Sequence, residues 1–230
     1  MDPLTLERTT EFGRLSRTRR LFELLGVCTA ALGGAYLTSL AAGRLGLPTS
    51  GELIFEGEWL SIGWDRFPWL DCVGMFLFMF ALPVVWRRLR LRRIRPLGSY
   101  PTGRVLTVSA IGAAAVLLAY AVRHVRGAAS EGLPPESVMI LGSYWFIVAL
   151  GEEVTFRGAL QAGCESVAGI LIALTVATVA FVFWHGLPAS LSQLLFRSAA
   201  GIAFGLLYHA SRSLIPPVLC HWLLNLALIA

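Results

Sequence analysis

The sequence predicts an all-α membrane protein, a polytopic bundle of about seven transmembrane helices. Hydrophobic residues make up 56% of the 230 residues and charged residues only 14%, whereas an ordinary soluble domain has about 25% charged residues. The mean hydropathy of +0.69 points the same way. The apolar residues form long runs and not the short alternating segments of a membrane β-barrel. The composition therefore excludes an ordinary soluble domain.

The apolar runs give the expected order of elements. A run of about 20 apolar residues is long enough to cross a bilayer as a helix. We expect a basic N-terminal arm at 1–20, followed by one membrane-embedded domain at 21–230. The expected spans lie at 21–42, 68–86, 104–122, 137–159, 166–184, 189–208 and 217–229. The last is short for a full span unless residues from Leu214 also count.

The positive charge gathers near the ends of the expected spans. All 19 basic residues are Arg, and the formal net charge is +5. Six Arg lie between Arg87 and Arg95, the pattern of a cytoplasmic loop. Membrane orientation explains this charge better than nucleic-acid binding does. We expect the lipid bilayer as a partner and a cytoplasmic N-terminus. The use of Arg without any Lys indicates a GC-rich, bacterial genome, so the expected location is a bacterial inner (cytoplasmic) membrane.

Three ionisable residues lie within the expected span 137–159. Glu152, Glu153 and Arg157 follow a dozen mainly apolar residues, and placing one such charge at bilayer depth costs roughly 2.5–3.5 kcal/mol. Residues four apart share a helix face, so Glu153 and Arg157 are expected to form an ion pair. Glu152 lies about 100° around the helix from Glu153 and is free to act as a general base. This cluster predicts a functional site.

Two later spans each bring polar groups to one face. Phe181 and His185 are four residues apart, as are His221 and Asn225, and His185 is the expected partner of Glu152. Together these groups can polarise a water molecule and donate hydrogen bonds to an oxyanion. Interhelical hydrogen bonding is the structural alternative. His209, at the end of its span, is interpreted as an interface or packing residue.

The spacing of these residues resembles a known family. Glu152-Glu153-x-x-x-Arg157, Phe181-x-x-x-His185 and His221-x-x-x-Asn225 are similar, in this order, to the motifs of the CAAX protease and bacteriocin-processing family of intramembrane glutamic endopeptidases. The resemblance spans about 137–225, and it sets the expected protease core at about 137–229. It implies that Glu152 and His185 activate the hydrolytic water, that His221 and Asn225 stabilise the oxyanion, and that Arg157 holds Glu153.

The resemblance implies a metal-free site and no cofactor. A zinc site formed by Glu152, His185 and His221 with an open fourth position is the metal alternative. The sequence lacks the HExxH motif of zinc proteases, a GxSG-like serine turn and a GxGD aspartyl motif.

The resemblance also bears on the substrate. It implies an endopeptidase acting on a membrane-associated protein or peptide, with a sorting role if the chain belongs to the myxosortase-like branch. The functional alternative is a non-catalytic membrane chaperone or bacteriocin-immunity protein on the same scaffold.

Overall fold

A computed structural model describes residues 3–49, 67–90, 102–125 and 135–229, and almost all of them are helical. The elements in chain order are α1 (Pro3–Arg44), α3 (Trp69–Gly74), η3 (Met75–Ala81), α4 (Leu82–Arg90), α5 (Thr102–Val125), α6 (Pro135–Glu153), η4 (Val154–Gln161), α7 (Ala162–Ala168), α8 (Ile170–Trp184), α9 (Leu191–Ser211) and α10 (Ile215–Ile229). The segments η3 and η4 are π-helical turns within longer rods. Counted as rods, the described chain has seven helices, which confirms the predicted all-α membrane bundle.

Length and composition mark several of these helices as membrane spans. Four are long and apolar enough to cross a membrane: Leu21–Arg44, Trp69–Trp86, Met139–Ala168 and Leu191–Ser211. Three more described helices, α5, α8 and α10, contain shorter apolar stretches. The protein is therefore an integral membrane protein, as predicted.

Two predicted boundaries differ from the structure. The fourth span was expected to end at 159, but its rod continues through η4 and α7 to Ala168. The fifth span was expected from 166, but α8 begins at Ile170, because Gly169 breaks the helix with a φ of 83°. Glycine adopts such a positive φ without the steric cost that a Cβ would add. The basic arm expected at 1–20 is helical from Pro3 and continues into the first span without a break.

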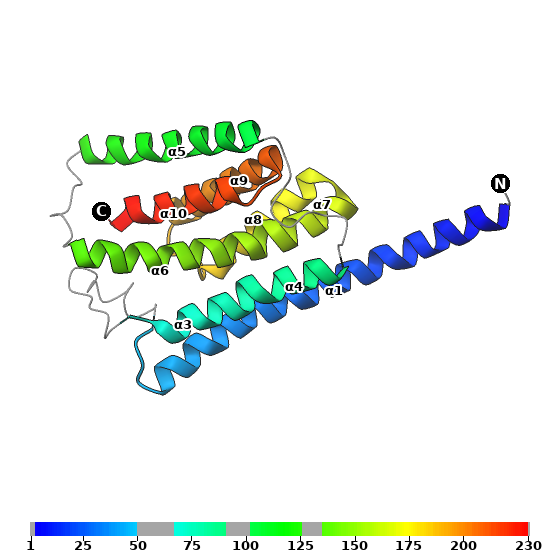
Figure 1. The fold of residues 1–230 in the computed structure, drawn as a ribbon, viewed down its shortest axis with the longest axis horizontal. Coiled ribbons are helices and arrows are strands. Elements are labelled where there is room, and N and C mark those ends of the chain that lie inside the picture. The colour runs from blue at the N-terminus through cyan, green and yellow to red at the C-terminus, as the bar shows by residue number, and fades with distance from the viewer. Residues whose placement is uncertain (1–2, 50–66, 91–101, 126–134, 230) are drawn as a thin grey trace.

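The rods lie roughly side by side (Figure 1), with the rod of α6, η4 and α7 near the centre. On one side α10 packs against α6, α5 and α9, and on the other α1 packs against α3 and η3. Helix α8 packs against α9, α7 and η4. The main apolar core gathers side chains from the central rod and its neighbours, including Met79, Phe156, Phe181 and Phe204.

The two π-helical turns lie next to each other in the fold. In η3 the N–H of Leu82 bonds to the carbonyl of Leu77, five residues earlier. In η4 the N–H of Ala162 reaches the carbonyl of Arg157 in the same way. Such bonds widen the helix, and single π-helical turns occur frequently at functional sites.

Close helix contacts depend on small residues where two backbones approach. A Cβ built on Gly112 of α5 would collide with the sulfur of Cys220 on α10 and lie 3.3 Å from the side chain of Leu207 on α9. By contrast, a Cβ on Gly103, near the start of α5, would meet no atom within 4 Å.

We predict that Gly112→Leu lowers the stability of the protein by about 1–3 kcal/mol, because the larger side chain forces α5 away from α10. Gly103→Leu, the same change in the same helix, is the control and is expected to have little effect. The measurement is the thermal unfolding midpoint of the purified protein in detergent. An unchanged midpoint for Gly112→Leu would contradict the packing of α5 described above.

Candidate active site

Two adjacent carboxylates lie at the end of α6, where the helix passes into η4. The side chain of Glu152 is 3% exposed and that of Glu153 is fully buried. Both residues lie near the middle of the candidate span Met139–Ala168. Since charged groups at this depth need partners, the surrounding residues decide whether the two carboxylates can stay ionised.

Arg157 pairs with Glu153 as the spacing predicts. Its Nε lies 3.2 Å from Glu153 Oε2, and neither side chain is exposed. A second guanidinium nitrogen donates a hydrogen bond of 3.0 Å to the carbonyl of Gly201 on α9. The guanidinium also lies 4.7 Å from the ring centroid of Phe181 and 5.5 Å from that of Phe204. The carboxylate, the carbonyl and the ring faces together compensate the buried positive charge.

Gln161 repeats the contact of Arg157 one turn further along the same rod. Its side-chain amide donates a hydrogen bond of 2.9 Å to the carbonyl of Gly205, four residues after Gly201. A π-helix has more residues per turn than the about 3.6 of an α-helix, so η4 brings residues four apart closer to alignment. A Cβ on Gly205 would lie 2.9 Å from Gln161 Oε1. The small residues of α9 therefore permit this double contact.

The two histidines of the site are held by hydrogen bonds at Nδ1. His185 Nδ1 lies 2.8 Å from the carbonyl of Phe181, and His221 Nδ1 lies 2.9 Å from Glu153 Oε1. A carbonyl or carboxylate oxygen can only accept, so each Nδ1 carries the proton. The opposite nitrogens, both Nε2, lie 3.7 Å and 3.8 Å from Glu152 Oε2. Two imidazoles from separate helices thus face one carboxylate oxygen.

Trp184 fixes the other oxygen of Glu152. Its indole Nε1 donates a hydrogen bond of 3.1 Å to Glu152 Oε1, while Oε2 has no hydrogen-bond partner among the described residues. The indole therefore makes the two oxygens different and leaves Oε2 to the histidines. Trp184 was not predicted from the sequence as a site residue. Its position directly before His185, at the end of an apolar helix, could have indicated that it lies at the site.

The structure brings most of the predicted site residues together. Glu152, Glu153, Arg157, Phe181, His185 and His221 are joined by the contacts above, and the ring centroids of Phe181 and His185 lie 4.7 Å apart. Asn225 lies one turn beyond His221 on α10, and its Nδ2 is buried without a hydrogen-bond partner in the described chain. His185 is the most open member, with 33% of its side chain exposed.

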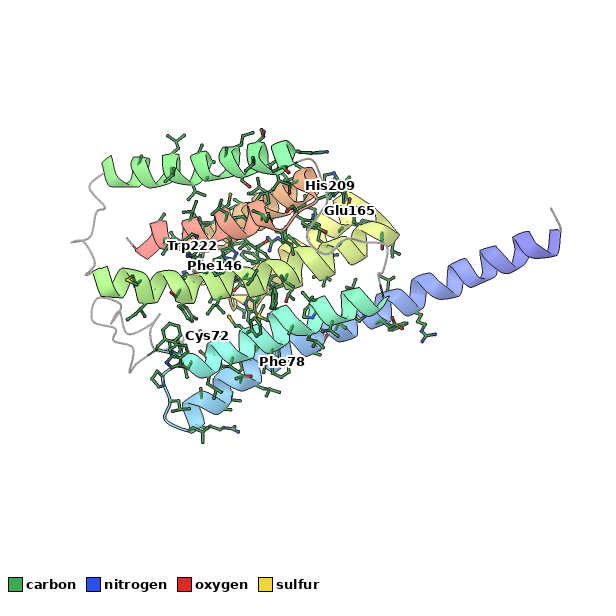
Figure 2. The ribbon with its side chains drawn as sticks, viewed as in Figure 1. Cys72, Phe78, Phe146, Glu165, His209 and Trp222 are labelled. Carbon is green, nitrogen blue, oxygen red and sulfur yellow. The ribbon has the colours of Figure 1, made fainter. Side chains whose placement is uncertain are left out.

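Other polar groups lie elsewhere in the bundle. Glu165 Oε1 contacts His209 Nδ1 at 3.1 Å and Arg212 at 2.6 Å. Figure 2 shows Glu165, which lies on α7, close to His209 near the end of α9. Within the described residues, no group of three or more His, Cys, Asp and Glu side chains is arranged to hold a metal ion. The four cysteines are free and buried.

The fold and the buried polar cluster define a helical membrane protein with a candidate reaction centre inside the bundle. Residues 134–227 match the family described as type II CAAX prenyl endopeptidase Rce1-like. The match covers less than half of the chain, and it supports assignment of this part to the CAAX protease and bacteriocin-processing family of intramembrane proteases. The match runs from α6 into α10 and leaves α1 to α5 outside. Comparison with curated proteins and with solved structures found no match.

The match supports the family inferred from the sequence motifs and does not separate its branches. The myxosortase-like assignment stays a prediction.

We predict that Arg157→Met destabilises the protein by about 3–5 kcal/mol, because it leaves the carboxylate of Glu153 buried without its cation. Arg19→Gln is the control: Arg19 is exposed and pairs with Glu23 at 3.0 Å, a kind of contact that contributes only about 0–1 kcal/mol. The measurement is the thermal unfolding midpoint of each variant, purified in detergent, compared with that of the wild-type protein.

The double variant Glu153→Gln and Arg157→Met removes both charges and is expected to recover part of the loss. If Arg157→Met unfolds at the wild-type temperature, the ion pair does not compensate a buried charge.

Proposed function

We propose that the protein is an intramembrane endopeptidase of the glutamic type, which hydrolyses a peptide bond of a membrane-associated protein or peptide. The observation that carries this proposal is the approach of two histidine Nε2 atoms to one buried carboxylate oxygen, Glu152 Oε2, at 3.7 Å and 3.8 Å. These distances are too long for direct hydrogen bonds, and a polar contact of this length suits a shared water molecule.

Charge balance supports different roles for the two histidines. With neutral imidazoles, Glu152, Glu153 and Arg157 leave one uncompensated negative charge near mid-membrane, which is costly. A second proton on His221 would bring the sum to zero, and the ring faces two carboxylates, Glu153 Oε1 at 2.9 Å and Glu152 Oε2 at 3.8 Å. His221 then has an N–H at Nε2 to donate. His185, held at Nδ1 by a carbonyl, keeps its Nε2 lone pair and can accept a proton.

The reaction begins when Glu152 Oε2 takes one proton from a water molecule whose other hydrogen is held by His185 Nε2. The water oxygen attacks the carbonyl carbon of the scissile bond, and the carbonyl oxygen becomes an oxyanion. His221 Nε2–H and the amide of Asn225 donate hydrogen bonds to that oxyanion, as preorganised donors do in other hydrolases. The proton is then delivered to the leaving nitrogen, the C–N bond breaks, and the products are a carboxylic acid and an amine.

The depth of the site supports a substrate that lies in or on the membrane. Helix α8 has 15 residues and is about 22 Å long, shorter than the roughly 30 Å hydrocarbon core. His185 follows its last residue and contacts Glu152, which lies near the middle of a candidate span. Because His185 is the open member of the site, substrate is expected to approach past this end of α8.

We propose the inner membrane of a bacterium, with the N-terminus in the cytoplasm, as the setting.

We predict that Glu152→Gln and His185→Ala each reduce cleavage at least about a hundredfold, because each removes a group that orients or deprotonates the water. His209→Asn is the matched control, since His209 contacts Glu165 and not the site. The measurement compares the protein termini in membrane and secreted fractions of wild-type and variant cells. Processed termini that disappear in Glu152→Gln and persist in His209→Asn identify the substrate.

Normal processing by Glu152→Gln would overturn the mechanism. If deleting the whole protein nevertheless changed the cells, that result would favour a binding or immunity role.

We also predict that the purified protein keeps its cleavage activity after treatment with EDTA or 1,10-phenanthroline. The proposed steps use side chains of this chain alone, so removing divalent metals leaves them in place. Activity that is lost to the chelator and restored by added Zn²⁺ would instead indicate a zinc site made by Glu152, His185 and His221.

A further inference from the structure

Pro83 leaves one backbone carbonyl of the second rod without its ordinary helical partner. In a continuous α-helix the carbonyl of Met79 accepts from the N–H of residue 83, and Pro83 has no N–H. The proline ring also presses against the carbonyl four residues earlier. Pro83 is fully buried and lies just after η3, with only Leu82 between. The π-helical turn Met75–Ala81 thus ends just before the position where a backbone donor is missing.

Thr155 of the central rod supplies the missing donor. Its hydroxyl donates a hydrogen bond of 2.8 Å to the carbonyl of Met79, and both residues are fully buried. Threonine hydroxyls on neighbouring helices are one means of satisfying backbone groups that a proline frees within a membrane. Thr155 lies in η4, two residues after Glu153 and two before Arg157.

A glycine allows this close contact between the two rods. A Cβ on Gly151 would lie 3.3 Å from Met79 Cβ and 3.6 Å from the carbonyl of Met75. The first distance is shorter than most Cβ contacts and the second is an ordinary van der Waals contact. A side chain larger than a methyl group at position 151 would therefore push η3 away. Since Gly151 directly precedes Glu152, the chain is held by η3 on both sides of the two carboxylates, at Gly151 and at Thr155.

We propose that Thr155 is a positioning residue for the active site, with the freed carbonyl of Met79 as its anchor. The inference rests on the proposed function and extends it to the rod of α3, η3 and α4, which lies outside the family match. The anchor holds the π-helical turn η4, and this turn sets how Glu152 and Glu153 are rotated relative to Arg157. Return of η4 to α-helical winding would turn the carboxylates away from His185 and His221.

The test is a double-mutant cycle between Thr155→Val and Pro83→Ala. Valine keeps the shape of threonine and removes the donor, whereas Pro83→Ala adds an N–H that can donate to the carbonyl of Met79 in α-helical winding. In the natural background Thr155→Val is expected to lower kcat about tenfold with KM unchanged, as for the loss of a buried hydrogen bond. In the Pro83→Ala background the same change is expected to cost less than about threefold. The substrate is the peptide whose processing Glu152→Gln abolishes.

Two further variants separate positioning from general packing. Thr155→Ser keeps the hydroxyl and is expected to retain kcat within about threefold of wild type. Thr178→Val is the matched control, because Thr178 is buried and its hydroxyl has no hydrogen-bond partner in the described residues. Equal losses for Thr155→Val in both backgrounds, or a Thr155→Ser variant as slow as Thr155→Val, would overturn the proposal.

Thermal unfolding of the four proteins of the cycle in detergent gives a second readout that needs no substrate. The unfolding midpoint is expected to fall with Thr155→Val in the natural background and to change little in the Pro83→Ala background. The Thr155→Val protein can fail to accumulate in the membrane when the natural Pro83 is kept. In that case, accumulation of the double variant supports the proposed anchor, and its failure to accumulate overturns the proposal. Failure of the proposed function would appear separately, as equal processing by wild type and Glu152→Gln.

Discussion

The buried pair of Glu153 and Arg157 is the constraint around which the rest of the structure is arranged. Both side chains are fully buried near the middle of a candidate span, where an unpartnered charge is costly. The pair is not sufficient by itself, because each ion has further hydrogen-bonding capacity to satisfy. The carbonyl of Gly201 and the ring of Phe181 contact Arg157, and His221 contacts Glu153, while Arg157 Nη1 has no hydrogen-bond partner among the described residues. The site residues are thus joined to one another and to α8, α9 and α10 by these contacts.

The same need explains why side chains bond to backbone carbonyls throughout the interior. Arg157, Gln161 and Thr155 each donate to a carbonyl on another helix. Water is scarce inside a bilayer, so such contacts replace hydration and fix the rotation of the central rod. The rotation in turn determines which carboxylate oxygen meets the histidines. Stability and proposed chemistry consequently depend on one set of hydrogen bonds.

The sequence predicted the helical membrane bundle and the helix faces that carry the site. The four-residue spacing of Glu153 and Arg157 was sufficient to predict their ion pair, because that contact lies within one helical rod. The donors Trp184 and Thr155 were missed, since their partners are distant in sequence and depend on how whole rods are rotated. The π-helical turn η4 was also missed, because no residue pattern within it marks the change of winding. The chemical roles of the site residues stay predictions.

The order of the site residues along the chain has a consequence for biosynthesis. Glu152, Glu153 and Arg157 belong to one rod, so the ion pair can form as soon as that rod enters the membrane. His221 belongs to α10, which follows every other described helix. A ribosome-bound chain that has not yet released α10 lacks the proposed donor to the oxyanion. The order of synthesis would therefore keep a partly made molecule from cutting its neighbours in the membrane.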